Sequence, residues 1–139
     1  FPGTAPGTNL PDESGTNNYS NERCVPDRPM NARMLACSFQ MAGLRVFDVR
    51  DPYHPREIAY YKPPAVRREV RPASGSWEAG VDRTVDKIAG YVRWQRVRGR
   101  EGARQWELWT ISDGNGFQVL RFTDDFKARH RTLVESSRK

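Results

Sequence analysis

The chain has 139 residues, which is enough for one domain with a hydrophobic core, since small domains commonly have about 100–150 residues. Only 37% of the residues are hydrophobic, 29% are charged, and Gly and Pro together number 21 (11 plus 10), so the apolar residues must be concentrated in short segments to offset the entropy of ordering the chain. No run of about 18 apolar residues is present, which excludes a membrane-spanning helix from this sequence.

The net charge of the chain is +6, and 19 of its 23 basic residues are arginine. A nucleic-acid-binding protein would gather such arginines in a stripe or patch with aromatic residues between them. Here they are scattered, with one denser run that comprises Arg93, Arg96, Arg98, Arg100 and Arg104. Scattered charge is typical of a solvated surface, so the sequence argues against nucleic acid as a partner.

Residues 1–23 are rich in Gly, Pro, Thr, Asn and Ser and contain almost no apolar anchor. This composition predicts a disordered, flexible linker or a long surface loop. Residues 18–20 form an Asn-Tyr-Ser glycosylation sequon, which is relevant only in a secreted eukaryotic protein. The chain begins with Phe rather than Met, so residue 1 need not be the start of the gene product, and the lack of a secretory leader in this sequence says little about its location.

The two cysteines, Cys24 and Cys37, lie 13 positions apart (37 minus 24). Because there is no Cys-x-x-Cys pair and no cluster of His or Cys nearby, they do not indicate a zinc site. In a cytosolic protein they would be free buried thiols, whereas in an oxidising compartment they would form a disulfide. The even count in a loop-rich chain favours the disulfide, with both interpretations open at this stage.

The composition changes at Arg33, and the next three predicted strands are at residues 34–39, 44–49 and 57–61. The second of them is apolar on both faces, as expected when each face of a sheet is covered. After it, Asp51, Pro52 and Pro55 turn the chain, because an Asp side chain can bond to the backbone just ahead and proline fixes φ and lacks a donor. Asp48 and Asp51 could also serve as metal ligands or acids, and forming the turn is the favoured role.

Residues 65–105 are predicted to be a loop-rich insertion with one candidate strand at residues 91–97. The segment 106–123 then has two apolar runs around a turn formed by Asp113, Asn115 and Gly116, and Asn-Gly between apolar runs is a strong hairpin signal. These turn residues superficially resemble a calcium loop, but the further ligand positions are absent, which favours the hairpin. Residues 124–139 are predicted to be a polar tail.

The hairpins at residues 34–49 and 106–123 can be laid over each other with an offset of 73 residues (116 minus 43). Leu35 stands eight residues before Gly43, and Leu108 stands eight residues before Gly116. Apolar residues follow each glycine at the second, fourth, fifth and seventh places, counting the glycine as the first. Because a propeller blade usually has about 40–50 residues, this offset requires an insertion within residues 65–105. Each repeat would be a small antiparallel sheet with both faces buried against neighbours.

The stretch GLRVFDVRDPYHPREIAYY, residues 43–61, resembles the LVIVD repeat, in which a Gly-Leu strand ends in Asp and is followed by an Asp-Pro turn, a second proline and a short outer strand. The matching residues are Gly43, Leu44, Val46, Asp48, Asp51, Pro52, Pro55, Ile58 and Tyr60. The second copy, GFQVLRF, keeps the glycine and the apolar strand but lacks the Asp-Pro turn. The segments CVPDRP and LACSF, followed by this unit and by the later DGNGFQVLRFT, resemble the C-terminal portion of secreted or surface-associated bacterial proteins of this family, and the resemblance covers residues 24–64 and 106–123 but not the stretch between them.

This resemblance implies an all-β fold of antiparallel, blade-like sheets in a partial β-propeller, with residues 24–64 as the first repeat and residues 106–123 as the second, incomplete one. It also implies an extracellular, periplasmic or cell-surface location, and it supports a disulfide between Cys24 and Cys37. Two blades cannot close a ring, so we expect further blades of the same polypeptide or partner chains to complete it, with cell-envelope proteins as candidate partners. The segment alone is expected to aggregate or to be loosely folded.

Groups that could carry catalysis are few. His54 lies in the Asp-Pro turn and His130 in the tail, and an isolated loop histidine is usually solvated. The tryptophans at positions 77, 94, 106 and 109 are expected to serve packing. No nucleotide-binding, serine-hydrolase or zinc-protease motif is present, and the resemblance brings no catalytic residue, cofactor or metal. The sequence therefore favours a scaffold for protein or surface contacts, and the alternative is a propeller enzyme or small-ligand-binding domain whose site is built mainly by blades outside this chain.

Overall fold

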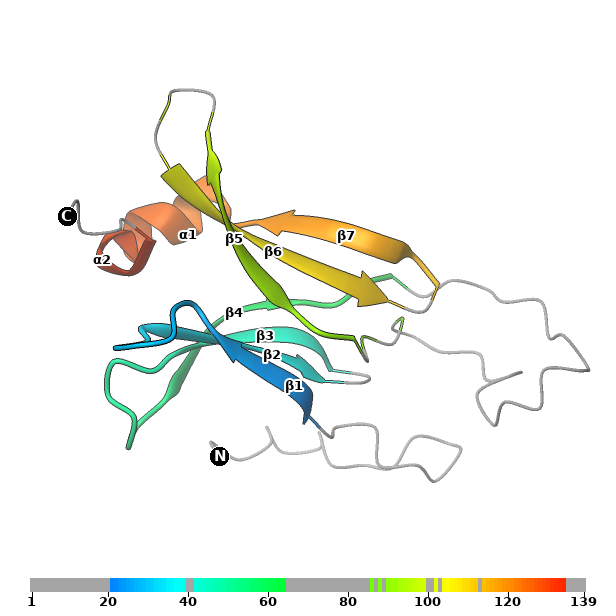
Figure 1. The fold of residues 1–139 in the computed structure, drawn as a ribbon, viewed down its shortest axis with the longest axis horizontal. Coiled ribbons are helices and arrows are strands. Elements are labelled where there is room, and N and C mark those ends of the chain that lie inside the picture. Colours follow the sequence, from blue (N-terminus) through cyan, green and yellow to red (C-terminus); the bar gives the residue numbers. More distant parts are fainter. Residues whose placement is uncertain are drawn as a thin grey trace, which may run out of the picture.

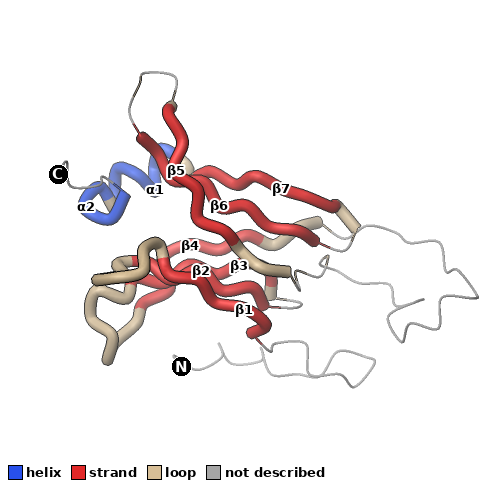
Figure 2. Tube along the Cα trace, in the orientation of Figure 1, coloured by secondary structure: helices blue, strands red, loops and turns tan. Residues whose placement is uncertain are grey.

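A computed structural model of the chain describes residues 21–39, 42–64, 86, 88, 90–99, 102, 104–112 and 114–134. The first sheet is antiparallel and has the order β1 (Asn21–Pro26), β2 (Met34–Phe39), β3 (Gly43–Asp48) and β4 (Arg56–Tyr61). The second sheet is antiparallel too and has the order β5 (Arg93–Arg98), β6 (Arg104–Ser112) and β7 (Gly116–Arg121). Two short helices follow, α1 (Asp124–Arg129) and α2 (Arg131–Val134). Figure 1 shows the two sheets as separate layers, and Figure 2 shows both helices at one end of them.

The hairpins β2–β3 and β6–β7 have the same register once the offset of 73 residues is applied. Leu35 lies opposite Phe47 in the first hairpin, and Leu108 lies opposite Leu120 in the second. β3 and β7 each begin with a glycine of positive φ, 78° and 72° respectively. The repeat detected in the sequence is therefore also a repeat of strand pairing and of the left-handed backbone conformation of the glycine that begins the second strand.

The two sheets differ beyond this shared hairpin. β4 lies beside β3 in the first sheet, whereas among the described residues no strand lies beside β7 on the side away from β6. The residues 73 positions after β4 are 129–134, and they belong to the helical end of the chain. The second sheet is thus a three-stranded version of the first.

The hydrophobic core lies between the two sheets. Its buried residues come from both sheets, from the segment before β5 and from the helices: Met34, Ala36, Leu44, Val46, Ile88, Val92, Trp106, Leu108, Phe126, Leu133 and Val134. On the β1 and β5 side, the indole Nε1 of Trp94 donates a hydrogen bond of 2.8 Å to the carbonyl oxygen of Val25. Burial of these side chains, at about 25 cal/mol per Å² of apolar surface, is what holds the two sheets face to face.

The predicted antiparallel β fold is confirmed, with two short helices added, and the sheets in the described part of the chain are open rather than closed into a ring. β1 begins at Asn21, so the last residues of the linker predicted for 1–23 belong to a strand, and residues 1–20 lie outside the described residues. The stretch NERCVP has no local strand signal, because its only large aliphatic side chain is Val25. Pairing with β2 and a disulfide hold this edge strand in the sheet.

Two further elements differ from the sequence predictions. β5 belongs to the second sheet, so this sheet starts inside the insertion predicted for 65–105, and the candidate strand at 91–97 is observed at Arg93–Arg98. The polar tail predicted for 124–139 contains both helices, because the hydroxyl of Thr123 caps α1 by accepting a hydrogen bond from the backbone N–H of Phe126. Neither helix is long and apolar enough to cross a membrane.

Candidate functional site

The disulfide joins β1 to β2 at the edge of the first sheet. Cys24 and Cys37 lie directly opposite each other in the antiparallel pair, and their sulfur atoms are bonded. The predicted disulfide is therefore confirmed. Its position holds an edge strand that has few apolar contacts of its own.

The Asp-Pro turn between β3 and β4 is organised around Asp51. Its carboxylate accepts a hydrogen bond of 3.0 Å from the backbone N–H of Tyr53 and lies 2.9 Å from Nδ1 of His54. The hydrogen bond with His54 lowers the pKa of Asp51, and the bond from Tyr53 acts in the same direction. Pro52 directly follows Asp51, Pro55 directly follows His54, and the side chains of Asp51 and His54 are 60% and 77% exposed. The pair is open to solvent, and its observed contacts are those of a turn.

Asp48 ends β3 and pairs with Arg50 at 2.7 Å. The hydrogen bond from the Arg50 side chain is the largest of the influences that lower the pKa of Asp48. Arg50 also reaches the hydroxyl of Thr132 in α2, at 3.4 Å. Within the part of the chain that the structure describes, no group of three His, Cys, Asp or Glu side chains could hold a metal ion.

The turn between β6 and β7 is fixed by Asp86, a residue whose sequence surroundings carry no signal of such a role. The carboxylate of Asp86 accepts hydrogen bonds from the backbone N–H groups of Gly114 and Asn115 and from the side-chain amide of Asn115, all at 2.8 Å to one carboxylate oxygen. The Asn115 amide also donates to the carbonyl oxygen of Pro64, at 2.9 Å. Gly116 follows in the left-handed region, and Asp113 lies outside the described residues. The predicted hairpin is present, and its turn is anchored to the segment after β4.

Burial alone would raise the pKa of Asp86, which is only 7% exposed. Hydrogen bonds from Ser112, Asn115 and Gly114 favour the ionised form and outweigh burial, so the pKa of Asp86 lies below its ordinary value. A carboxyl group with a lowered pKa in the folded state stabilises the fold above its unfolded pKa. That stabilisation is lost as the pH falls through the lower, folded pKa.

We therefore expect Asp86→Ala to lower the free energy of unfolding at pH 7 by about 2–3 kcal/mol, because several N–H donors lose a charged acceptor. Urea unfolding at pH 7 and at pH 3 measures this, and the difference between the variant and the unmodified protein should shrink at the lower pH. Asp125→Ala is the matched control, since the side chain of Asp125 is 75% exposed and its helical ion pair should contribute no more than about 0.5 kcal/mol. Equal losses for the two variants would show that Asp86 does not anchor the turn.

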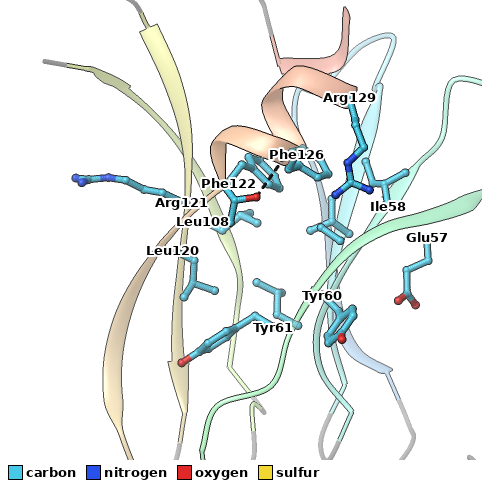
Figure 3. Close-up of a pocket in the computed structure, with 14 residues that line it drawn as sticks. Glu57, Ile58, Tyr60, Tyr61, Leu108, Leu120, Arg121, Phe122, Phe126 and Arg129 are labelled. Carbon is cyan, nitrogen blue, oxygen red and sulfur yellow. Dashed lines mark hydrogen bonds between the residues drawn. The ribbon is translucent and has the colours of Figure 1, made fainter. Parts of the chain in front are cut away.

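A groove of about 480 Å³ opens between β4 and β7 and is closed at one end by α1. Its apolar lining comes from both sheets and from the helix: Leu44, Val46, Ile58, Ala59, Tyr61, Leu108, Leu120, Phe122 and Phe126. Figure 3 shows the side chains of Leu120 and Tyr61 lining this groove, whereas the side chain of Arg121 points away from it. The groove lies where β7 has no neighbouring strand among the described residues.

The outer face of the second sheet carries a second apolar surface, which we call the front face and define by Trp109, Ile111, Phe117 and Val119. Ile111, Phe117 and Val119 are 55%, 60% and 44% exposed. The rings of Trp109 and Phe117 meet edge to face at 5.8 Å. Exposed apolar side chains that gather on one face of a sheet are typical of an interaction surface.

An ion pair borders the front face. Arg121 donates to a carboxylate oxygen of Glu107 at 2.8 Å, and the indole Nε1 of Trp109 donates to the other oxygen at 3.0 Å. The hydrogen bond from Trp109, followed by that from Arg121, lowers the pKa of Glu107. Glu107 is 4% exposed, so these two bonds hold a buried charge and fix the orientation of the Trp109 ring.

The other candidate residues have structural contacts. Trp94 and Trp106 pack edge to face at 5.6 Å between the sheets, and the ring of His130 lies against Phe126 at 4.6 Å. Trp77 lies outside the described residues. The guanidinium of Arg96 lies over the Trp106 ring, 4.9 Å from its centroid.

The groove and the front face were not predicted from the sequence. The tryptophans and the aliphatic residues of the second hairpin have the pattern of core residues, and both faces of the hairpin were expected to be buried. The repeat itself holds the signal that could have found the front face. The residues of the front face align with residues of the first hairpin that are buried. The repeat therefore indicates that a further sheet of the same kind covers the front face. For Asp86 no such signal exists, because its partners Gly114 and Asn115 lie 28 and 29 residues away in the chain.

No family model, no curated protein and no solved structure matches the chain.

Proposed function

We propose that the chain is a segment of an extracellular or cell-surface β-propeller of the LVIVD-repeat type and that it acts as a scaffold for protein or surface contacts. The observation that carries this proposal is the repeat of one hairpin, with one register, in two sheets that pack face to face. A propeller is built from such sheets, stacked so that each covers a face of the next. Further blades of the same polypeptide or partner chains complete the ring.

The proposed location is supported by the disulfide between Cys24 and Cys37, because disulfides persist in oxidising compartments and are rare in the cytosol. The scaffold role is supported by the front face. It exposes three large apolar side chains side by side on one sheet, an arrangement that favours a macromolecular partner over a small substrate.

The location is tested by producing the full-length gene product in its own host. Intact cells are labelled with a membrane-impermeant biotin reagent, and free thiols are trapped with a maleimide during lysis. We expect the protein to be biotinylated or recovered outside the cytoplasm, with Cys24 and Cys37 reacting with maleimide only after reduction. A protein found only in the cytosol with both thiols reduced would contradict the proposal.

The scaffold role is tested by crosslinking in the envelope fraction with the full-length protein and its variants. We expect a defined crosslinked partner that is lost with Phe117→Glu and retained with Tyr53→Glu, since Tyr53 is 86% exposed but lies in the Asp-Pro turn. A partner that is retained with both variants would show that the front face is not the contact surface.

The groove between β4 and β7 favours a second candidate function, the binding of a small apolar ligand. Its volume of about 480 Å³ falls in the range of about 300–1,000 Å³ that ligand pockets commonly have. Saturable binding of the dye anilinonaphthalene sulfonate should be lost with Leu120→Arg, whose side chain lines the groove, and retained with Val119→Arg on the opposite side of the same strand. Binding that both variants retain would exclude the groove.

A further inference from the structure

The 73-residue repeat shows which face of the first sheet corresponds to which face of the second sheet. Side chains that lie opposite each other in an antiparallel pair project from the same face. With the offset of 73 residues, the front face of the second sheet (Trp109, Ile111, Phe117, Val119) corresponds to Ala36, Ser38, Leu44 and Val46 of the first sheet. The front faces of the two sheets are therefore the same side of the same repeated unit.

In the first sheet, this side is the one that contacts the second sheet. Ala36 and Ser38 are 0% exposed, and Leu44 and Val46 are 1% and 2% exposed. Leu44 and Val46 also line the groove together with Leu108 from the second sheet. The front face of the first sheet is thus covered, whereas the equivalent face of the second sheet carries side chains that are 44–60% exposed.

The second sheet contacts the first through its opposite side, which we call the back face. Its residues are Trp106, Leu108, Thr110, Ser112 and Leu120. The equivalent back face of the first sheet contains Leu35, Phe39 and Phe47, with the disulfide beside them. Phe47 is only 8% exposed, Leu35 and Phe39 are half-buried, and Tyr60, which lies opposite Arg45 on the same side, is 66% exposed.

We propose that the front face of the second sheet docks onto the back face of the first sheet of a second copy of this chain. Within one chain, the front face of the first sheet already packs against the back face of the second sheet. The same packing between two chains therefore needs no new type of contact. Both halves of the interface are present: an exposed apolar front face at one end, and at the other end a back face on which Leu35, Phe39 and Tyr60 surround the Arg45–Glu57 ion pair. This inference rests on the proposed function, because it names the partner of the sheets proposed there.

Such an interface is heterologous, since the two copies contribute different surfaces. Heterologous contacts close into a ring when the rotation between units allows it, and otherwise they continue as a filament. A symmetric dimer that buries one front face against another would instead use the same surface twice. The two arrangements respond differently to charges placed on one face, and this difference makes the proposal testable.

The test places a charge on each face of the full chain and measures mass by light scattering during size-exclusion chromatography over a range of concentrations. The front variant is Phe117→Glu together with Val119→Glu, and the back variant is Leu35→Glu. Tyr60→Glu is a second back variant, since its exposed side chain makes a folding failure less of a concern. Tyr53→Glu is the matched control in the Asp-Pro turn, and circular dichroism checks that each variant is folded.

We expect the unmodified chain and the Tyr53→Glu control to form species larger than one chain in a concentration-dependent way. Each face variant should be monomeric alone, and an equimolar mixture of a front variant and a back variant should give a species of twice the mass of one chain, because each retains one intact face. Self-association that the front variant abolishes and both back variants retain would overturn the proposal in favour of a symmetric front-to-front contact.

An unmodified chain that stays monomeric at every concentration would also overturn the proposal, and the occupant of the front face would then be a further sheet of the same polypeptide or a foreign protein. That result leaves the proposed function standing, because the surface-labelling experiment tests the location independently of self-association. Conversely, self-association of a protein confined to the cytosol would support the interface and contradict the proposed function.

Discussion

Gly43→Ala should lower the free energy of unfolding by about 3–4 kcal/mol, because the added methyl group meets both an unfavourable backbone conformation and a steric clash. Gly43 has a φ of +78°, and a Cβ atom there would lie 2.2 Å from the carbonyl oxygen of Tyr61. The backbone of β4 would have to move away from β3 at the point where this pair begins. Urea unfolding at pH 7 measures the loss.

Gly116→Ala is the matched control, because the two glycines occupy equivalent places in the repeat. Gly116 has a φ of +72°, but no atom lies within 4 Å of the position its Cβ would take. We expect only the cost of the left-handed backbone, about 1–2 kcal/mol. The difference between the two losses tests whether β4 lies beside β3 at Gly43 while, among the described residues, no strand lies beside β7 at Gly116, so equal losses would contradict the strand order described.

The second large effect is expected from the disulfide. Replacing Cys24 and Cys37 together with serine should lower the free energy of unfolding by about 3 kcal/mol, because the bond restricts a loop of 13 residues in the unfolded chain. The loss should be accompanied by faster amide hydrogen exchange in β1, which also contacts the second sheet through the hydrogen bond from Trp94 to Val25 and is linked to the segment before β5 by the guanidinium of Arg23 over the Tyr91 ring. Denaturant unfolding and exchange mass spectrometry measure the two effects.

Reduction of the unmodified protein provides an independent version of the same change. Oxidised protein with added reductant should resemble the double serine variant in stability and in exchange at β1, and the variant itself should not respond to reductant. If reduced and oxidised protein unfold at the same denaturant concentration, the bond does not hold β1 to the sheet.

The central hairpins could be predicted from the sequence because local signals agree there. Asn115 and Gly116 mark one turn, Gly43 begins the other strand, and the apolar runs on either side set the register. The partner strand β1 could not be predicted, since its place depends on Cys37 and on backbone pairing with β2 rather than on its own apolar residues. α1 did carry a local signal, the cap at Thr123 with two acidic residues after it.

The candidate surfaces depend on distant contacts, and this limits what the sequence alone can predict. The groove forms because β4 and β7, separated by more than 50 residues, face each other across the core. The alternating pattern of β7 predicts that Phe117 and Val119 share one face, but it does not say whether that face is covered. Only the placement of the first sheet against Leu108 and Leu120 identifies the uncovered side.

A structure of the assembled protein, by electron microscopy or crystallography, tests most directly the claim that like sheets stack front face to back face. We expect Trp109, Ile111, Phe117 and Val119 to be buried against the face of another sheet that carries residues equivalent to Leu108 and Leu120. A structure in which two front faces meet across a two-fold axis, or in which these four side chains remain in solvent, would contradict it.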